Sequence, residues 1–197
     1  MVKQSLGVLA LCCFGISGAA IAREGSGVYI YGAAGQAQQA SIMKDNQDAY
    51  MLLLGYQLNS KWAVEGGYVD LGTTSYTGNI TVGGATGTAN LSSKSNAISV
   101  TAVRTWNVQD TFGNNGFSFL AKFGFAQVKS SATGSATIPT IFSASNSYTN
   151  KGVTVGLGAK FDFDQNWALR VDADSFDTGQ YAYGRVPVYS VGLSYKF

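Results

Sequence analysis

Few side chains in this 197-residue chain could do chemistry. Asp172 and Asp174 stand two residues apart in WALRVDADSF, so they share one face of a strand and could act as paired carboxylates in acid–base catalysis. Arg170 shares that face, which favours a structural ion-pair network instead. The chain has no histidine, and Cys12 and Cys13 lie in a segment that we expect to be removed. Triads with histidine and histidine-based metal sites are therefore impossible, and we predict neither enzyme activity nor a cofactor.

Other charged residues follow the same alternation. In FSFLAKFGFAQ, Lys122 shares a face with Gly124 and opposes four phenylalanines, and in VTVGLGAKF, Lys160 shares a face with two glycines. Strand parity predicts an inward-facing set with three charges of each sign: Glu65, Asp172 and Asp174 against Lys122, Lys160 and Arg170. Charges in a narrow interior are tolerated when they are paired. We expect Lys160 and Arg170 to face each other across a hairpin, separated by Glu65 or Asp172, and we predict that this network closes any pore.

These residues must be positioned by strands, because apolar residues alternate with small or polar ones throughout the chain. Eight strands are predicted, at 27–38, 48–58, 62–72, 94–106, 116–129, 148–163, 167–176 and 186–197. Three links are short (59–61, 107–115 and 164–166), and four are longer loops (39–47, 73–93, 130–147 and 177–185). Short turns at one end and long loops at the other predict an all-β, eight-stranded antiparallel up-and-down transmembrane β-barrel.

The two faces of the strands distinguish a membrane barrel from a soluble one. A soluble barrel would place the aromatic face inside, but the interior of an eight-stranded barrel is only just wide enough for side chains. Charged residues make up 12% of the chain, about half the roughly 25% of soluble domains. A lipid-facing arginine or lysine at mid-depth costs about 2–4 kcal/mol. The aromatic face should therefore contact lipid. Aromatic residues near strand ends are expected to form girdles: Tyr29, Tyr31, Tyr56, Trp62, Tyr68, Trp167, Tyr195 and Phe197.

The N-terminus has the pattern of a secretory signal peptide. Lys3 precedes the apolar run from Leu6 to Ile16, and Ala20-Ile21-Ala22 fits the cleavage rule. We expect a cleavable signal peptide at 1–22 and one barrel domain over 23–197. Without Lys3 the 13 basic side chains become 12, against 11 acidic ones, and this balance argues against a nucleic-acid partner.

The last segment, YSVGLSYKF, predicts how the barrel closes. Tyr189, Val191, Leu193, Tyr195 and Phe197 alternate with small or polar residues. We expect these five side chains to face lipid, and the segment to pair with GVYIYGAAGQ (27–36). Closure satisfies every backbone hydrogen-bonding group without water, which a bilayer requires.

GYQLNSKWAVEGGYVDLG (55–72) resembles the second hairpin of the outer membrane protein A transmembrane domain, and VGLSYKF (191–197) is similar to the last strand of that family. The resemblance implies the outer membrane of a Gram-negative bacterium, with long loops extracellular and both termini periplasmic. It implies that the alternating residues of 189–197 form the signal read by the barrel assembly machinery, a transient partner. In that family acidic and basic side chains block the interior. Glu65 and Arg170 match such positions, whereas Lys160 replaces an acidic residue.

Two functions are consistent with these features. The first is a structural and surface-interaction role, in which a monomeric barrel supports envelope integrity or adhesion, and its extracellular loops contact a host or environmental ligand. The alternative is a narrow porin-like channel for ions or small solutes. Interior charges of both signs favour a plug over a channel, since a channel lining is mostly of one sign.

Overall fold

The computed structural model describes residues 26–38, 46–82, 84–108, 116–138, 140–177, 179 and 184–197, so the predicted signal peptide lies outside the described residues. The strands are β1 Gly27–Gln38, β2 Asn46–Asn59, β3 Trp62–Val82, β4 Ala85–Asn107, β5 Phe117–Ile138, β6 Thr140–Asp162, β7 Trp167–Asp177 and β8 Arg185–Lys196. No described helix is long and apolar enough to cross a membrane.

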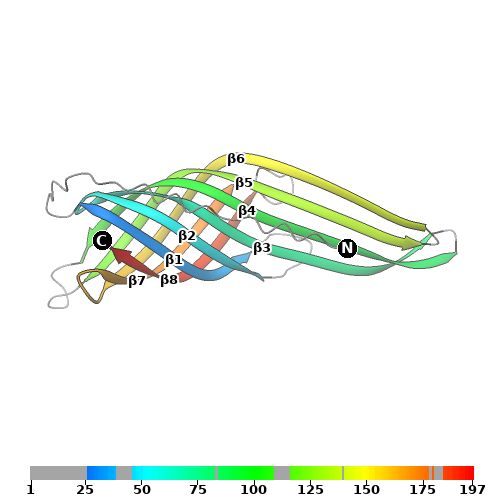
Figure 1. Ribbon diagram of the computed structural model, residues 1–197, viewed down its shortest axis with the longest axis horizontal. Coiled ribbons are helices and arrows are strands. Elements are labelled where there is room, and N and C mark those ends of the chain that lie inside the picture. Colours follow the sequence, from blue (N-terminus) through cyan, green and yellow to red (C-terminus); the bar gives the residue numbers. More distant parts are fainter. Residues whose placement is uncertain are drawn as a thin grey trace.

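Each strand pairs antiparallel with its sequence neighbours, and β8 pairs with β1 (Figure 1). The closing register aligns Tyr31 with Ser194 and Ala34 with Val191. The eight-stranded up-and-down barrel predicted from the sequence is therefore confirmed, including its closing pair.

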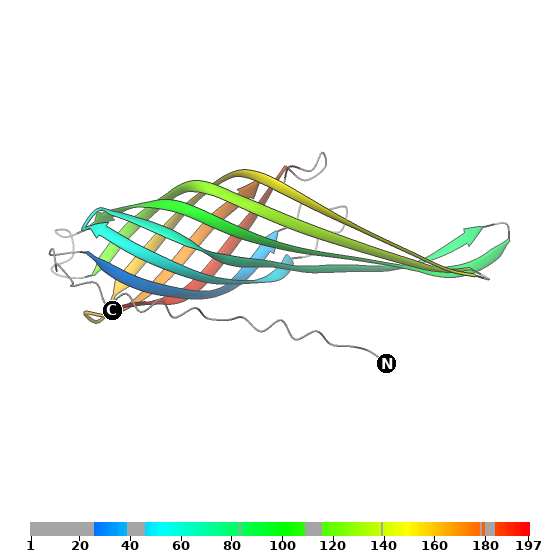
Figure 2. The ribbon, with the colours of Figure 1, turned by 45° about the horizontal axis from the view of Figure 1, so that its top comes forward.

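The predicted loops at 73–93 and 130–147 are wrong, because β3, β4, β5 and β6 continue through them as strands. The two hairpins also pair with each other, with β4 and β5 aligned as far as Thr88 and Thr137. Threonine is frequent in both segments, and it favours strands even where no apolar face exists. We call these parts of the four strands (73–82, 85–93, 130–138 and 140–147) the extension. It projects from the barrel at the end opposite the C-terminus (Figures 1 and 2).

A β-bulge separates the extension from the barrel on β3. The register between β3 and β4 shifts between Asp70 and Thr73. Gly72 lies there with φ of +86°, a conformation that other residues rarely adopt, and its backbone N–H donates to Asp70 Oδ1 at 3.0 Å. The extra residue changes which face the later side chains of β3 occupy.

Outside the barrel, large apolar side chains cover every strand, and Leu54, Phe125 and Leu157 are each at least 60% exposed. Trp62, Tyr56, Tyr68, Trp167 and Phe197 are also exposed, as expected of girdle residues. The prediction was wrong for Tyr29 and Tyr31, which face the interior. Their register partners on β8, Lys196 and Ser194, belong to the inward face, and side chains in register share a face.

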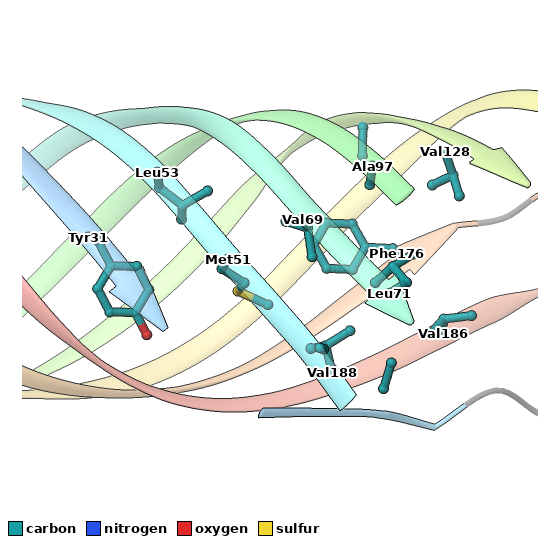
Figure 3. Packing of buried hydrophobic residues seen from close by; sticks show 13 residues of the cluster. Tyr31, Met51, Leu53, Val69, Leu71, Ala97, Val128, Phe176, Val186 and Val188 are labelled. Carbon is teal, nitrogen blue, oxygen red and sulfur yellow. The ribbon is translucent and has the colours of Figure 1, made fainter. Parts of the chain in front are cut away.

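Inside the barrel, an apolar cluster fills the half nearer the extension. It comprises Tyr31, Ala37, Ala49, Met51, Leu53, Val69, Leu71, Ala97, Ala126, Val128, Phe176, Val186 and Val188. In Figure 3, Tyr31 stands at one side of this cluster and Val128, Phe176 and Val186 at the other. We call it the apolar layer. The interior is thus not only small and charged, as the sequence suggested, but also contains a packed hydrophobic core.

Close approach between strands predicts a sensitive position. A methyl group on Gly124 would meet the backbone of Val100 and Thr101 on β4, whereas one on Gly32 would meet nothing within 4 Å. We expect Gly124→Ala to lower the free energy of unfolding by about 1–3 kcal/mol, as overpacking does. Gly32→Ala, the matched control, should leave it unchanged. Denaturant unfolding of the refolded barrel measures both, and equal effects would contradict the steric explanation.

Candidate functional site: the charged barrel interior

Three strands supply the buried charges. Glu65 comes from β3, Lys122 from β5, and Arg170, Asp172 and Asp174 from alternate positions of β7. All five side chains are buried, with Glu65 only 1% exposed. The alternation that sends Trp167, Leu169 and Val171 outward sends the three β7 charges inward.

Arg170 is the centre of the first half of this site. Its two terminal nitrogens form a bidentate pair with the Glu65 carboxylate, with Nη2 donating to Oε2 at 3.0 Å and Nη1 contacting Oε1. Its Nε lies 2.8 Å from Asp172 Oδ2. The guanidinium carbon lies 4.5 Å from the centre of the Tyr31 ring, and Tyr29 Oη donates to Glu65 Oε1 at 2.6 Å. A planar guanidinium suits this double recognition, because it presents several donors in a fixed geometry.

Lys122 completes the network. Its Nζ donates to Asp174 Oδ2 at 2.7 Å and lies 3.1 Å from Asp172 Oδ1. Asp172 therefore bridges the two basic groups, and the chain of contacts runs Glu65–Arg170–Asp172–Lys122–Asp174. Burial of isolated charges is costly, and this arrangement offsets the cost because each charge contacts an opposite one. We call these five residues the ion-pair network.

Lys160 is not brought into the ion-pair network, contrary to the sequence expectation. Register does place it beside Arg170 across the β6–β7 hairpin. Its Nζ, however, pairs with Asp162 Oδ1 at 2.9 Å near the short turns, where both side chains are partly exposed. Pairing of Lys160 with Asp162, two residues away at the open end of the barrel, requires less desolvation than pairing with a carboxylate in the interior. A cavity of about 70 Å³ is lined both by this outer pair and by Glu65 and Arg170 of the network.

Sequence reasoning missed two groups of interior residues. Tyr29 and Tyr31 contact the network, and their inward direction follows from the register with Lys196 and Ser194, which the predicted pairing of the two segments did not specify. The apolar layer was also missed, although Phe176 shares the parity of Asp174, and Leu71 that of Glu65. Across the described ranges, no three acidic side chains are arranged to hold a metal ion.

A closed ring of eight strands, apolar outside and with paired charges inside, defines a transmembrane β-barrel. The chain matches the family model described as the outer membrane protein beta-barrel domain over residues 6–197. It therefore belongs to this family of outer-membrane barrels, and the predicted relationship to outer membrane protein A-like barrels is confirmed. Among curated protein sequences, none matches the chain significantly.

Solved structures show the same fold at low identity. Ail of Yersinia pestis, solved with the heparin analogue sucrose octasulfate, has a TM-score of 0.54 and 18% identity, over 89% of this chain and 100% of that one. Neisserial surface protein A has a TM-score of 0.56 and 14% identity, over 87% and 97% of the two chains. The N-terminal barrel of Pseudomonas aeruginosa OprF has 0.53 and 15%, over 87% and 99%.

The network predicts a graded response to charge removal. Glu65→Gln keeps the side-chain shape but leaves Arg170 with Asp172 as its only anionic partner. We expect the free energy of unfolding to fall by about 3–5 kcal/mol, the typical effect of breaking a buried pair. Asp162→Asn removes only the partly exposed pair with Lys160, and should cost less than about 1 kcal/mol. Denaturant titrations in micelles measure both, and similar losses would show that burial does not determine the strength of these pairs.

Proposed function

We propose that this protein is a closed outer-membrane barrel with a structural and surface-interaction role, exerted through the extension. The observation that carries this proposal is the combination of a filled interior with four strands that continue far beyond it. A channel needs the opposite design, in which the interior is open. The porin-like alternative is therefore the less favoured one.

Two barriers in series support the closed state. An ion that enters from the short-turn end passes the small buried cluster of Ala63, Val103 and Leu120 and then meets the ion-pair network, in which carboxylates already engage the basic groups. It then meets the apolar layer, where Phe176, Leu71 and Val188 are at most 3% exposed. A hydrophobic constriction excludes ions even when charged groups lie nearby. Removal of either barrier alone leaves the other intact.

The extension supports a surface role. Residues 73–93 and 130–150 contain no charged side chain. One face of the extension carries rows of hydroxyl and amide groups in register, such as Ser75, Ser92, Thr133 and Ser145. Across one row, Thr77 Oγ1 donates to Asn90 Oδ1 at 2.8 Å. Such a surface is suited to a ligand recognised by hydrogen bonds, in contrast to the sulfated analogue seen with Ail.

We place the extension outside the cell and both termini in the periplasm, and we assign 189–197 as the assembly signal. The support for the signal is that its alternating side chains all lie on the outer face: Tyr189, Val191, Leu193, Tyr195 and Phe197. Tyr195 contacts Trp167 and Phe197 edge-on, with ring centres 4.8 and 5.0 Å apart. These rings form an accessible apolar surface at the end of the chain.

Conductance tests the closed state. In planar bilayers we expect no steady current from the wild-type protein, and none from Glu65→Ala or Phe176→Ala alone, because the second barrier remains. The double variant Glu65→Ala/Phe176→Ala should show open-channel events. As a matched control, Glu65→Ala/Phe123→Ala removes an outward phenylalanine instead and should stay closed. Steady wild-type current would contradict the proposal and favour the porin-like alternative.

Cysteine labelling tests the orientation. The predicted mature chain has no cysteine, so single cysteines can be introduced without interference. Ser145→Cys, in the extension, should react with a membrane-impermeant maleimide on intact cells. Gln165→Cys, in the short turn between β6 and β7, should react only after the outer membrane is permeabilised. The reverse pattern would place the extension in the periplasm.

A further inference from the structure

Three lysines lie on the outer face of the barrel where its apolar surface ends. Lys94, Lys129 and Lys151 are on the neighbouring strands β4, β5 and β6, and all three are exposed. Each is the first charged outward residue beyond the apolar stretch of its strand. On β6, for example, Lys151 follows Val153 directly on the outward face. We call these three residues the lysine arc.

The register shows how the three lysines are offset along their strands. Lys94 is aligned with Ser131, two residues beyond Lys129, and Lys129 is aligned with Thr149, two residues beyond Lys151. The line of lysines thus moves two residues toward the short turns at each strand.

The aromatic residues at the opposite edge of the apolar surface follow the same slant. Trp106 is aligned with Phe119, two residues from Phe117, and Phe117 is aligned with Phe161, two residues from Phe163. Strands in a barrel are tilted relative to its axis, so an offset of this kind keeps both lines at a nearly constant height on the barrel. The arc therefore follows the edge of the apolar surface on the side of the extension.

An apolar groove of about 480 Å³ lies immediately below the arc on the same face. Ile98, Val100, Phe125 and Val153 line it, and Lys151 stands at its rim. Three of these apolar side chains are exposed to a similar degree as the rest of the outer face: Ile98 at 62%, Val100 at 59% and Phe125 at 67%. The groove thus has an apolar wall and one lysine, Lys151, at its rim.

The charges of the arc are poorly compensated within the protein. Among the described residues, Lys129 and Lys151 have no ion-pair partner, and Lys94 contacts Asp70 only at 3.7 Å. Asp177, the nearest acid on β7, has its side chain against Gly152 and is aligned with Arg185 on β8. An anion at this place would therefore meet uncommitted positive charge.

We infer that the lysine arc and the groove bind one phosphorylated glycolipid, with its phosphates on the lysines and an acyl chain in the groove. Lysine binds phosphate as a point charge, and headgroup phosphates lie at the height of the arc. Between Lys94 and Lys151 the arc covers two inter-strand spacings, about 10 Å, and four residues along the strands, about 13 Å, so its ends are about 16 Å apart along the sheet. This span is too wide for a single phosphate and suits a headgroup with two separated phosphates. We choose lipid A as this glycolipid because the orientation proposed above, with the extension outside the cell, places the arc at the outer leaflet.

Native mass spectrometry of the full mature barrel in detergent tests this inference, with lipid A, lipid A without its phosphates, and inorganic phosphate as probes. Wild-type protein should retain lipid A. Each Lys→Gln change in the arc should weaken binding about fivefold, as expected for a lysine near an anionic headgroup. Lys129→Gln/Lys151→Gln should therefore lose about twenty-five-fold. Lys61→Gln, in the exposed turn at the other end, is the matched charge control and should bind like wild type.

The groove has its own test. Phe125→Ala should lower lipid A binding, whereas Phe161→Ala, an outward phenylalanine far from the groove, should not. The inference fails if dephosphorylated lipid A binds as tightly, if the arc variants bind like wild type, or if Lys61→Gln loses as much. Inorganic phosphate bound with the same lysine dependence, and no effect of Phe125→Ala, would also overturn it. Cysteine labelling decides the orientation separately, so the two failures can be distinguished.

Discussion

The absence of water in the bilayer core is the constraint on which this structure depends. Every backbone N–H and C=O must find a partner within the protein, and for a sheet this requires closure of β8 onto β1. Closure in turn fixes an inside and an outside for each strand. Because side chains alternate, one sequence pattern then determines both which residues meet lipid and which fill a narrow interior.

The interior is filled by two kinds of side-chain contact. Near the short turns, Arg170 and Lys122 are held between carboxylates, so no charge of the network is isolated. Nearer the extension, Phe176 and Leu71 pack with aliphatic side chains from other strands. Tyr31 belongs to both regions, since its ring lies against Arg170 and also joins the apolar layer. The filled interior therefore stabilises the barrel, and the same side chains form the closure that we propose.

Much of this architecture could be predicted from the sequence because alternation is a local property. The strands of the barrel and the inward parity of Glu65 and Arg170 follow from it directly. Lys160 shows the limit, since parity gives the face of a residue but not the direction of a long, flexible side chain. Tyr29 and Tyr31 could not be placed by type, because an aromatic ring suits the membrane interface and a cation contact equally well. The extension was missed because its strands lack an apolar face and are held by pairing alone.

The outward side chains of the strands that enter the extension also indicate where the membrane ends. Along the outer face of β4, Val100 and Ile98 are followed by Asn96, Lys94 and Ser92, while pairing with β5 continues without interruption. The backbone therefore does not change at the boundary, and only the side chains do. Beyond it, water can satisfy hydroxyl groups on one face and the free edges of β3 and β6, so closure is no longer required. The change from a closed barrel to an open four-stranded sheet thus follows from the change of solvent.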